Sequence, residues 1–139
     1  MRKTLIGLSS LLVLTGCGQS VEASLAETCT VVMADPDVQR DIVAASITTE
    51  DFCACTSKRI MTMPDAQRDT AVETFEMMES LMAEHNGSAE DAFRALSEAR
   101  RADDATPEAI ASYENMDELG EQLEDFLDEM RASGGVCPV

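Results

Sequence analysis

The sequence predicts an all-α domain, a small bundle of four or five helices cross-linked by two disulfides. Three observations support this fold class. Apolar residues recur at spacings of three and four along the chain, and the alternation typical of strands is absent. Capping and turn residues divide the chain into helical lengths. Four cysteines follow residue 24, and this even number fits two disulfides in an exported protein: Cys29, Cys53, Cys55 and Cys137.

Three helical segments are expected in the first part of the domain. Leu25–Met33 has apolar side chains at helical spacing. Asp35 and Pro36 form an N-cap and a first helical residue for a short helix through Ala45, although its Val and Ile residues are weak helix formers. Thr48 begins a third helix, whose first-turn acids complement the helix dipole. This third helix is expected to carry Phe52, Cys53, Cys55, Ile60 and Met63.

Pro64 separates the third helix from a longer one, which is expected to run from Asp65 to His85. Gly87 suits the left-handed conformation that often follows a helix end. Ser88 is the expected N-cap of the next helix, which fades in the charged stretch 100–104. The apolar stripe of the longer helix consists of Val72, Phe75, Met78 and Met82.

The last expected helix begins with Thr106 as N-cap and Pro107 as first helical residue, and extends to about Ala132. Its apolar positions alternate spacings of four and three, which is a heptad pattern. Gly120 interrupts this seam and is expected to allow another helix to approach closely. The seam comprises Ala109, Tyr113, Met116, Gly120, Leu123, Leu127 and Met130, widened by Ile110, Leu119 and Phe126.

The N-terminus has the order of a bacterial export signal. Arg2 and Lys3 precede an apolar run from Leu5 to Leu14, which is far shorter than the roughly 20 residues that a spanning helix needs. Gly16-Cys17 follows this run. The stretch resembles the signal peptide and lipobox of bacterial lipoproteins. In that family the cysteine is acylated and becomes the first residue of the mature chain.

This resemblance implies three segments: a signal peptide over residues 1–16, a lipidated tether over 17–24, and an acidic helical domain over 25–139. Cys17 is then the lipidation site. Gly18 is not the aspartate that often marks inner-membrane retention in lipoproteins. The resemblance therefore implies a lipid-anchored envelope protein at the outer membrane, facing the periplasm.

With Cys17 acylated, four of the five cysteines remain for disulfides. Cys53 and Cys55 are two residues apart, so on a helix their side chains point about 200° from each other. They suit different partners, which leaves two pairings: Cys29–Cys53 with Cys55–Cys137, or Cys29–Cys55 with Cys53–Cys137. A redox-active dithiol formed by Cys53 and Cys55 is the alternative.

The charge of the mature chain limits the classes of partner that it can bind. Residues 17–139 hold eight basic and 27 acidic residues, a net charge of −19. Nucleic acid is excluded as a partner, because phosphate binding needs a basic face. Residues 103–129 contain eleven acids and no Lys or Arg. This stretch is interpreted as a solvated helix face or as a docking surface for a basic protein.

Catalytic and metal-binding patterns are weak. Met78, Met82 and His85 share one helical face and have the soft ligands that Cu(I) prefers. Methionine at helical spacing is more often core. Motifs for zinc or for an activated nucleophile are absent, and no cofactor is expected. The sequence therefore predicts a non-enzymatic envelope protein with a structural or protein-interaction role. The alternative is a periplasmic copper-binding or thiol-redox accessory protein.

Overall fold

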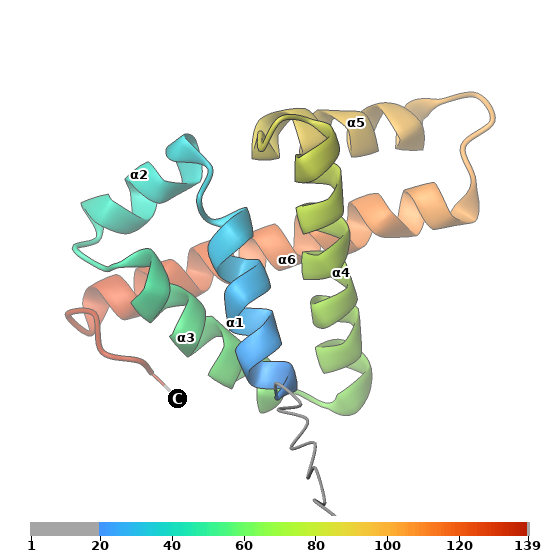
Figure 1. Ribbon diagram of the computed structural model, residues 1–139. Coiled ribbons are helices and arrows are strands. Elements are labelled where there is room, and N and C mark those ends of the chain that lie inside the picture. Colours follow the sequence, from blue (N-terminus) through green and yellow to red (C-terminus); the bar gives the residue numbers. More distant parts are fainter. Residues whose placement is uncertain (1–19, 139) are drawn as a thin grey trace, which may run out of the picture.

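The computed structural model describes residues 20–138, so Cys17 and the leader lie outside the described residues. This part of the chain is all-α and contains no strand, which confirms the predicted fold class (Figure 1). All six helical segments expected along the chain form, so this part of the chain has six helices and not the four or five of the predicted bundle. The helices are α1 (Val21–Val32), α2 (Pro36–Ala44), α3 (Thr49–Met61), α4 (Asp65–Glu84), α5 (Ala89–Arg101) and α6 (Pro107–Ala132).

Side-chain caps determine where five of these helices begin. At each of these starts a hydroxyl or carboxylate oxygen accepts a hydrogen bond from a backbone N–H of the first turn, which otherwise has no partner within the helix. The predicted starts after Asp35, Thr48, Ser88 and Thr106 are confirmed. Helix α4 begins after Pro64 without a side-chain cap.

Helix α1 begins earlier than the sequence predicted. The Oγ of Ser20 accepts a hydrogen bond from the backbone N–H of Ala23, and Glu22 lies in the positively polarised first turn. Residues 21–24, which were assigned to the tether, therefore form the first turn of α1. The small, polar composition of this stretch concealed a capped helix start, and the folded domain extends back to Ser20.

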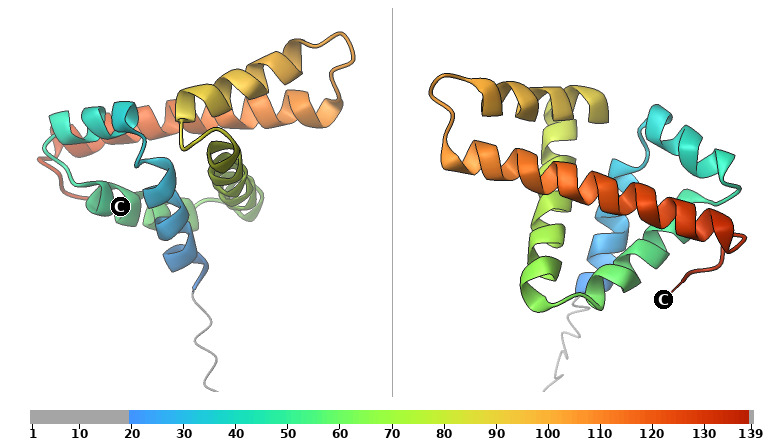
Figure 2. Two further views of the ribbon diagram at one scale, coloured as in Figure 1. Left: turned by 45° about the horizontal axis from the view of Figure 1, so that its top comes forward. Right: turned by 180° about the vertical axis from the view of Figure 1, so that it is seen from behind.

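Three of the helices form a layer, and the long helix α6 crosses it. Helices α1, α3 and α4 lie side by side, with α1 between the other two (Figure 1). Helix α6 runs across one side of this layer, and α5 lies antiparallel to the first half of α6 (Figure 2). Short α2 lies over the second half of α6. Its one buried residue is Ile42.

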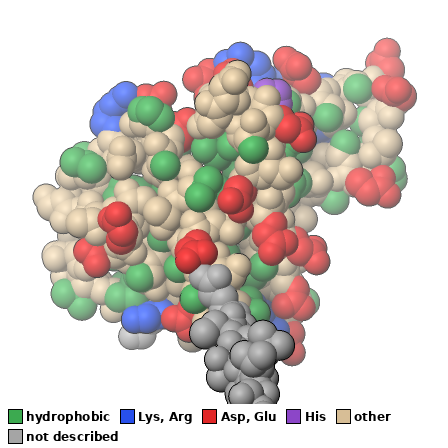
Figure 3. Space-filling view, viewed as in Figure 1, with side chains coloured by type: hydrophobic (Ala, Val, Ile, Leu, Met, Phe, Trp, Pro, Cys, Tyr) green, Lys and Arg blue, Asp and Glu red, His purple; other side chains and the backbone are tan. Residues whose placement is uncertain are grey.

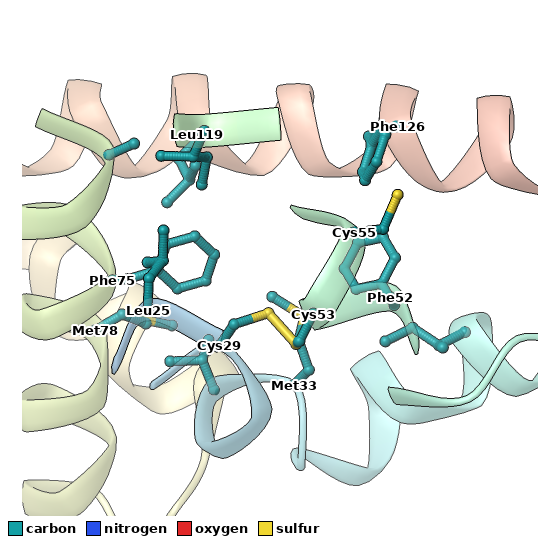
Figure 4. Packing of buried hydrophobic residues seen from close by; sticks show 14 of the residues in the cluster. Leu25, Cys29, Met33, Phe52, Cys53, Cys55, Phe75, Met78, Leu119 and Phe126 are labelled. Atoms are coloured by element: carbon teal, nitrogen blue, oxygen red, sulfur yellow. A yellow bond between two sulfur atoms is a disulfide. The ribbon is translucent and has the colours of Figure 1, made fainter. Parts of the chain in front are cut away.

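The core lies where α6 crosses the layer. Phe52 of α3 and Phe126 of α6 point toward one another, with ring centroids 6.0 Å apart (Figure 4). Phe75 of α4 packs beside Leu25 of α1 in the same view. The guanidinium of Arg59 covers the outer side of the Phe126 ring at 4.6 Å and contacts the Glu129 carboxylate. Three phenylalanines, together with Leu25, thus connect α1, α3, α4 and α6 in the core.

The heptad seam of α6 is only partly buried. Met116 and Met130 are buried as predicted, and so are Leu119 and Phe126, which were assigned to its margin. Gly120 is exposed, and a Cβ added there would meet no atom within 4 Å. The expected close approach at Gly120 is therefore wrong. Because α6 packs on several crossing helices and not on one partner, its buried line departs from a strict heptad.

Candidate functional site

The four cysteines of the domain form two disulfides, and the structure selects one of the two predicted pairings. Cys29 bonds to Cys53 and Cys55 bonds to Cys137, with Cα–Cα distances of 5.6 Å in both cases. The first disulfide is buried in the core between α1 and α3 (Figure 4). Cys53 and Cys55 thus have different partners, as their positions on opposite sides of a helix require.

The second disulfide returns the C-terminal tail to α3. Helix α6 ends at Ala132, and Gly134 and Gly135 follow with φ of 70° and 84°, which favour glycine. The backbone N–H of Gly135 donates to the Met130 carbonyl at 2.8 Å. This turn reverses the chain, so that Cys137 reaches Cys55.

The copper candidates divide between core and surface. Met78 and Met82 are 6% and 3% exposed and pack in the core, as methionine at helical spacing usually does. His85 is the half-buried C-cap residue of α4. Among residues 20–138 no group of three or more His, Cys, Asp or Glu side chains is placed to hold a metal ion. Copper binding stays a prediction.

An apolar groove with a volume of about 570 Å³ lies between α2 and α6. Its floor consists of buried side chains from α1, α3 and α4, among them Val32, Phe52 and Phe75. The α6 wall presents half-buried Leu123 and Leu127. Gly120 lies on the same wall, where its missing side chain leaves the wall low. The groove thus opens directly onto the hydrophobic core.

Charged side chains line the groove alongside these apolar ones. Asp41 of α2 and the α6 residues Glu124 and Asp128 contribute three carboxylates. Arg131 is the single cation, and its guanidinium pairs with Asp128. Asp41 and Glu124 have no ion pair with another described residue. The groove therefore combines an apolar interior with net negative charge.

One buried carboxylate positions the α2 wall. Asp35 is 7% exposed, and its Oδ1 caps α2 by accepting from the backbone N–H groups of Asp37 and Val38. Its Oδ2 accepts from the N–H of Ala89 at 2.9 Å, at the start of α5. Burial opposes the ionisation of Asp35, but the three N–H donors together lower its pKa below the ordinary value. One charged group thus joins two helix N-termini beside the groove.

Sequence reasoning named some groove residues but not the groove. Leu123 and Leu127 were assigned to the α6 seam, and Ile42 falls within the short helix expected after Asp35. Asp41 and Glu124 were not singled out. One signal in the sequence could have indicated the groove. The apolar face of α6 is wider than its contact with the core needs, because Leu119 and Phe126 already occupy the core side.

The N-terminal residues indicate how the protein is attached to the membrane. Residues 1–17 match the family model of the prokaryotic membrane lipoprotein lipid attachment site. The protein is a lipid-anchored envelope protein. The match ends at Cys17, the residue identified from the lipobox, which itself lies outside the described residues. Neither the curated proteins nor the solved structures contain a match to the chain. Within residues 20–138 no helix is both long and apolar enough to cross a membrane.

Proposed function

We propose that this lipid-anchored protein is a non-enzymatic interaction module, whose groove binds a basic, amphipathic segment of a protein partner. The observation that carries the proposal is the apolar groove between α2 and α6 with its three carboxylates. Laying the apolar face of a helix into such a groove is a common mode of peptide recognition.

The composition of the groove supports a protein segment over a small polar ligand. Small-molecule sites usually add a few convergent hydrogen-bond donors to an apolar pocket. Here the polar groups at the groove are carboxylates and one paired arginine. Leu123 and Leu127 lie one helical turn apart and provide a continuous apolar strip. Aliphatic side chains of a partner would bury this strip, and flanking Lys or Arg would reach the carboxylates.

The charge of the domain supports a basic partner. The described residues carry the whole excess of 27 acidic over eight basic residues. A field of this sign raises the association rate of basic proteins and suppresses acidic competitors. The acids of α6 continue along the helix from the groove, so that approach and final contact favour the same partner chemistry.

A role without catalysis is part of the proposal. The described residues that line the groove include no Ser, Thr, Cys, His or Lys. The usual nucleophiles and the commonest general base are therefore not in position there. Gly18 in place of aspartate supports the outer membrane, with the domain in the periplasm, as the place where the partner is met.

Peptide titration tests this function. A synthetic amphipathic helix with Leu on one face and Lys on the other is expected to bind the protein. The same peptide with Glu in place of Lys is not expected to bind. Leu123→Gln is expected to weaken binding about tenfold, a loss of about 1.4 kcal/mol. Ile110→Gln is the matched control, because Ile110 is an exposed apolar residue of α6 outside the groove. Equal binding of both peptides, or equal effects of both substitutions, would refute the proposal.

A further inference from the structure

We infer that the end of the domain formed by the N-terminus of α1 and the α3–α4 turn, residues 62–64, rests on the bilayer that holds the lipid. We call this end the membrane-facing end. The inference concerns a second surface and does not depend on the groove or its partner.

The first argument is the length of the tether. Cys17 is three residues before Ser20, the N-cap of α1. Three residue steps span at most about 11 Å between the two Cα atoms, even when fully extended. The acylated cysteine is therefore held within about one helix diameter of the start of α1.

The second argument is that α1 is fixed within the domain. Leu25, Cys29 and Val32 are buried, and the Cys29–Cys53 disulfide bonds α1 to α3. Helix α1 also packs along α4. It cannot separate from the other helices to lengthen the tether without opening the core. The lipid thus holds the whole domain at one defined point.

The third argument is the position of that point. The N-terminus of α1 and the α3–α4 turn lie at the same end of the domain in Figure 1 and in the right view of Figure 2, and α1 projects beyond the turn in the left view. Helices α2 and α5 lie toward the opposite end in these views. A tether of about 11 Å therefore leaves the α3–α4 turn nearest the bilayer and directs α2, with the groove, away from it.

The chemistry of the membrane-facing end suits a lipid interface. Val21 is 55% exposed, and half-buried Met61 and Met63 lie at the end of α3 and within the turn. Exposed Lys58, in the last turn of α3, forms no ion pair with a described residue and can extend its ammonium to a phosphate. Arg68 pairs with both Asp65 and Asp69, and Glu22 forms no ion pair with a described residue. The two cations Lys58 and Arg68 thus stand against three acids at this end.

This end therefore avoids the dense negative charge found along α6. Figure 3 shows basic and acidic side chains side by side at the lower edge of the domain. Contact through this end places apolar side chains and a lysine at the interface. It also keeps the eleven acids of residues 103–129 away from anionic headgroups.

Lipid quenching of a site-specific fluorophore tests the orientation. All four domain cysteines are in disulfides and Cys17 is acylated in the lipoprotein, so one introduced cysteine is the single free thiol. Thr62→Cys marks the membrane-facing end. Ala102→Cys, also an exposed cap position, at the end of α5, is the control. Each lipidated protein is labelled in vesicles of phosphatidylethanolamine and phosphatidylglycerol that contain headgroup-nitroxide lipid.

We expect a strong loss of fluorescence at position 62. At position 102 the loss of fluorescence should not exceed the loss measured for the same labelled variant without its lipid. Equal quenching at both positions would overturn the inference, because it would mean that the domain has no preferred orientation. Circular dichroism and thiol counting check that both variants are folded and fully oxidised.

A lengthened tether tests the cause. Insertion of about ten Gly and Ser residues after Gly18 gives a flexible tether with an average reach of more than 15 Å. We expect the difference in quenching between positions 62 and 102 to fall to a small fraction of its original value. A difference that survives the insertion unchanged would overturn the argument from tether length.

Discussion

At the scale of single residues, Asp35 connects the start of α2, which forms one wall of the groove, to the start of α5. One carboxylate caps α2 with one oxygen and receives the first N–H of α5 with the other. The two helices are 54 positions apart in sequence at this contact. Because both helix N-termini carry partial positive charge, the ionised carboxylate is favoured by both.

Replacing Asp35 should destabilise the domain more than removal of an ordinary cap. We expect Asp35→Ala to lower the free energy of unfolding by about 2–3 kcal/mol, because it removes a cap and leaves the part-buried N–H group of Ala89 in α5 without its acceptor. Urea denaturation measures this loss. Thr106→Ala, which removes a cap with a single bond, is the control and should cost about 1 kcal/mol. Equal losses would contradict the double role.

The lowered pKa of Asp35 predicts a loss of stability in acid. Its folded-state pKa lies below the unfolded value of about 4, so the carboxylate stabilises the fold fully above that pH. This contribution is lost as the pH falls through the folded-state pKa. The stability difference between the native protein and Asp35→Asn should therefore be constant from neutral pH to about pH 5 and shrink below about pH 4. A difference that stays constant down to pH 2 would disprove it.

Thr56 offers a stabilising substitution. Its side chain is buried, and its hydroxyl has no hydrogen-bond partner in the described part of the chain. Thr56→Val should raise the free energy of unfolding by about 1 kcal/mol, because it removes an unsatisfied buried hydroxyl. Thr74→Val is the control, since the Thr74 hydroxyl donates to the Thr70 carbonyl at 2.7 Å. Calorimetry should show opposite shifts in Tm for the two variants.

At the scale of helices, local chemistry predicts starts and ends better than packing. Thr48, Ser88 and Thr106 each identified a helix start, because a cap acts on N–H groups within three residues of itself. The start of α1 was missed because Ser20 lies in a stretch whose composition also suits a tether.

The groove had no comparable local signal. The groove forms because the Asp35–Ala89 hydrogen bond holds the start of α2 in a position that leaves one side of α6 uncovered. Both features depend on residues far apart in sequence, and periodicity cannot locate such contacts. Gly120 shows the same limit, since the sequence marked it as unusual but not whether its open side faced a helix or solvent.

The disulfide between α3 and the tail should contribute strongly to stability. It closes a loop with a sequence separation of 82. The chain-entropy model then gives about 4–5 kcal/mol for its removal. We expect the double substitution Cys55→Ala and Cys137→Ser to lower the free energy of unfolding by this order. Denaturation of the oxidised proteins measures it, and retention of full stability would show that the tail contributes nothing.

At the scale of the whole molecule, attachment depends on one residue outside the folded domain. Cys17→Ala should move the protein from the membrane to the soluble fraction, because the acyl chains provide the membrane affinity and the acidic domain does not. Fractionation followed by immunoblotting measures this. Ser20→Ala, which changes the helix cap but not the lipobox, should stay with the membrane. A membrane-bound Cys17→Ala protein would refute lipid anchoring.

The two disulfides also affect how the protein withstands proteases. They enclose residues 29–53 and 55–137 in two consecutive covalent rings. A single cut within either ring opens a loop but releases no fragment, since both new ends remain joined through sulfur. From Cys29 to Cys137, only the two peptide bonds around Ala54 lie outside a ring. A nicked copy would therefore stay attached to its lipid in one piece, and shedding would need reduction, a cut at Ala54, or cleavage near the anchor.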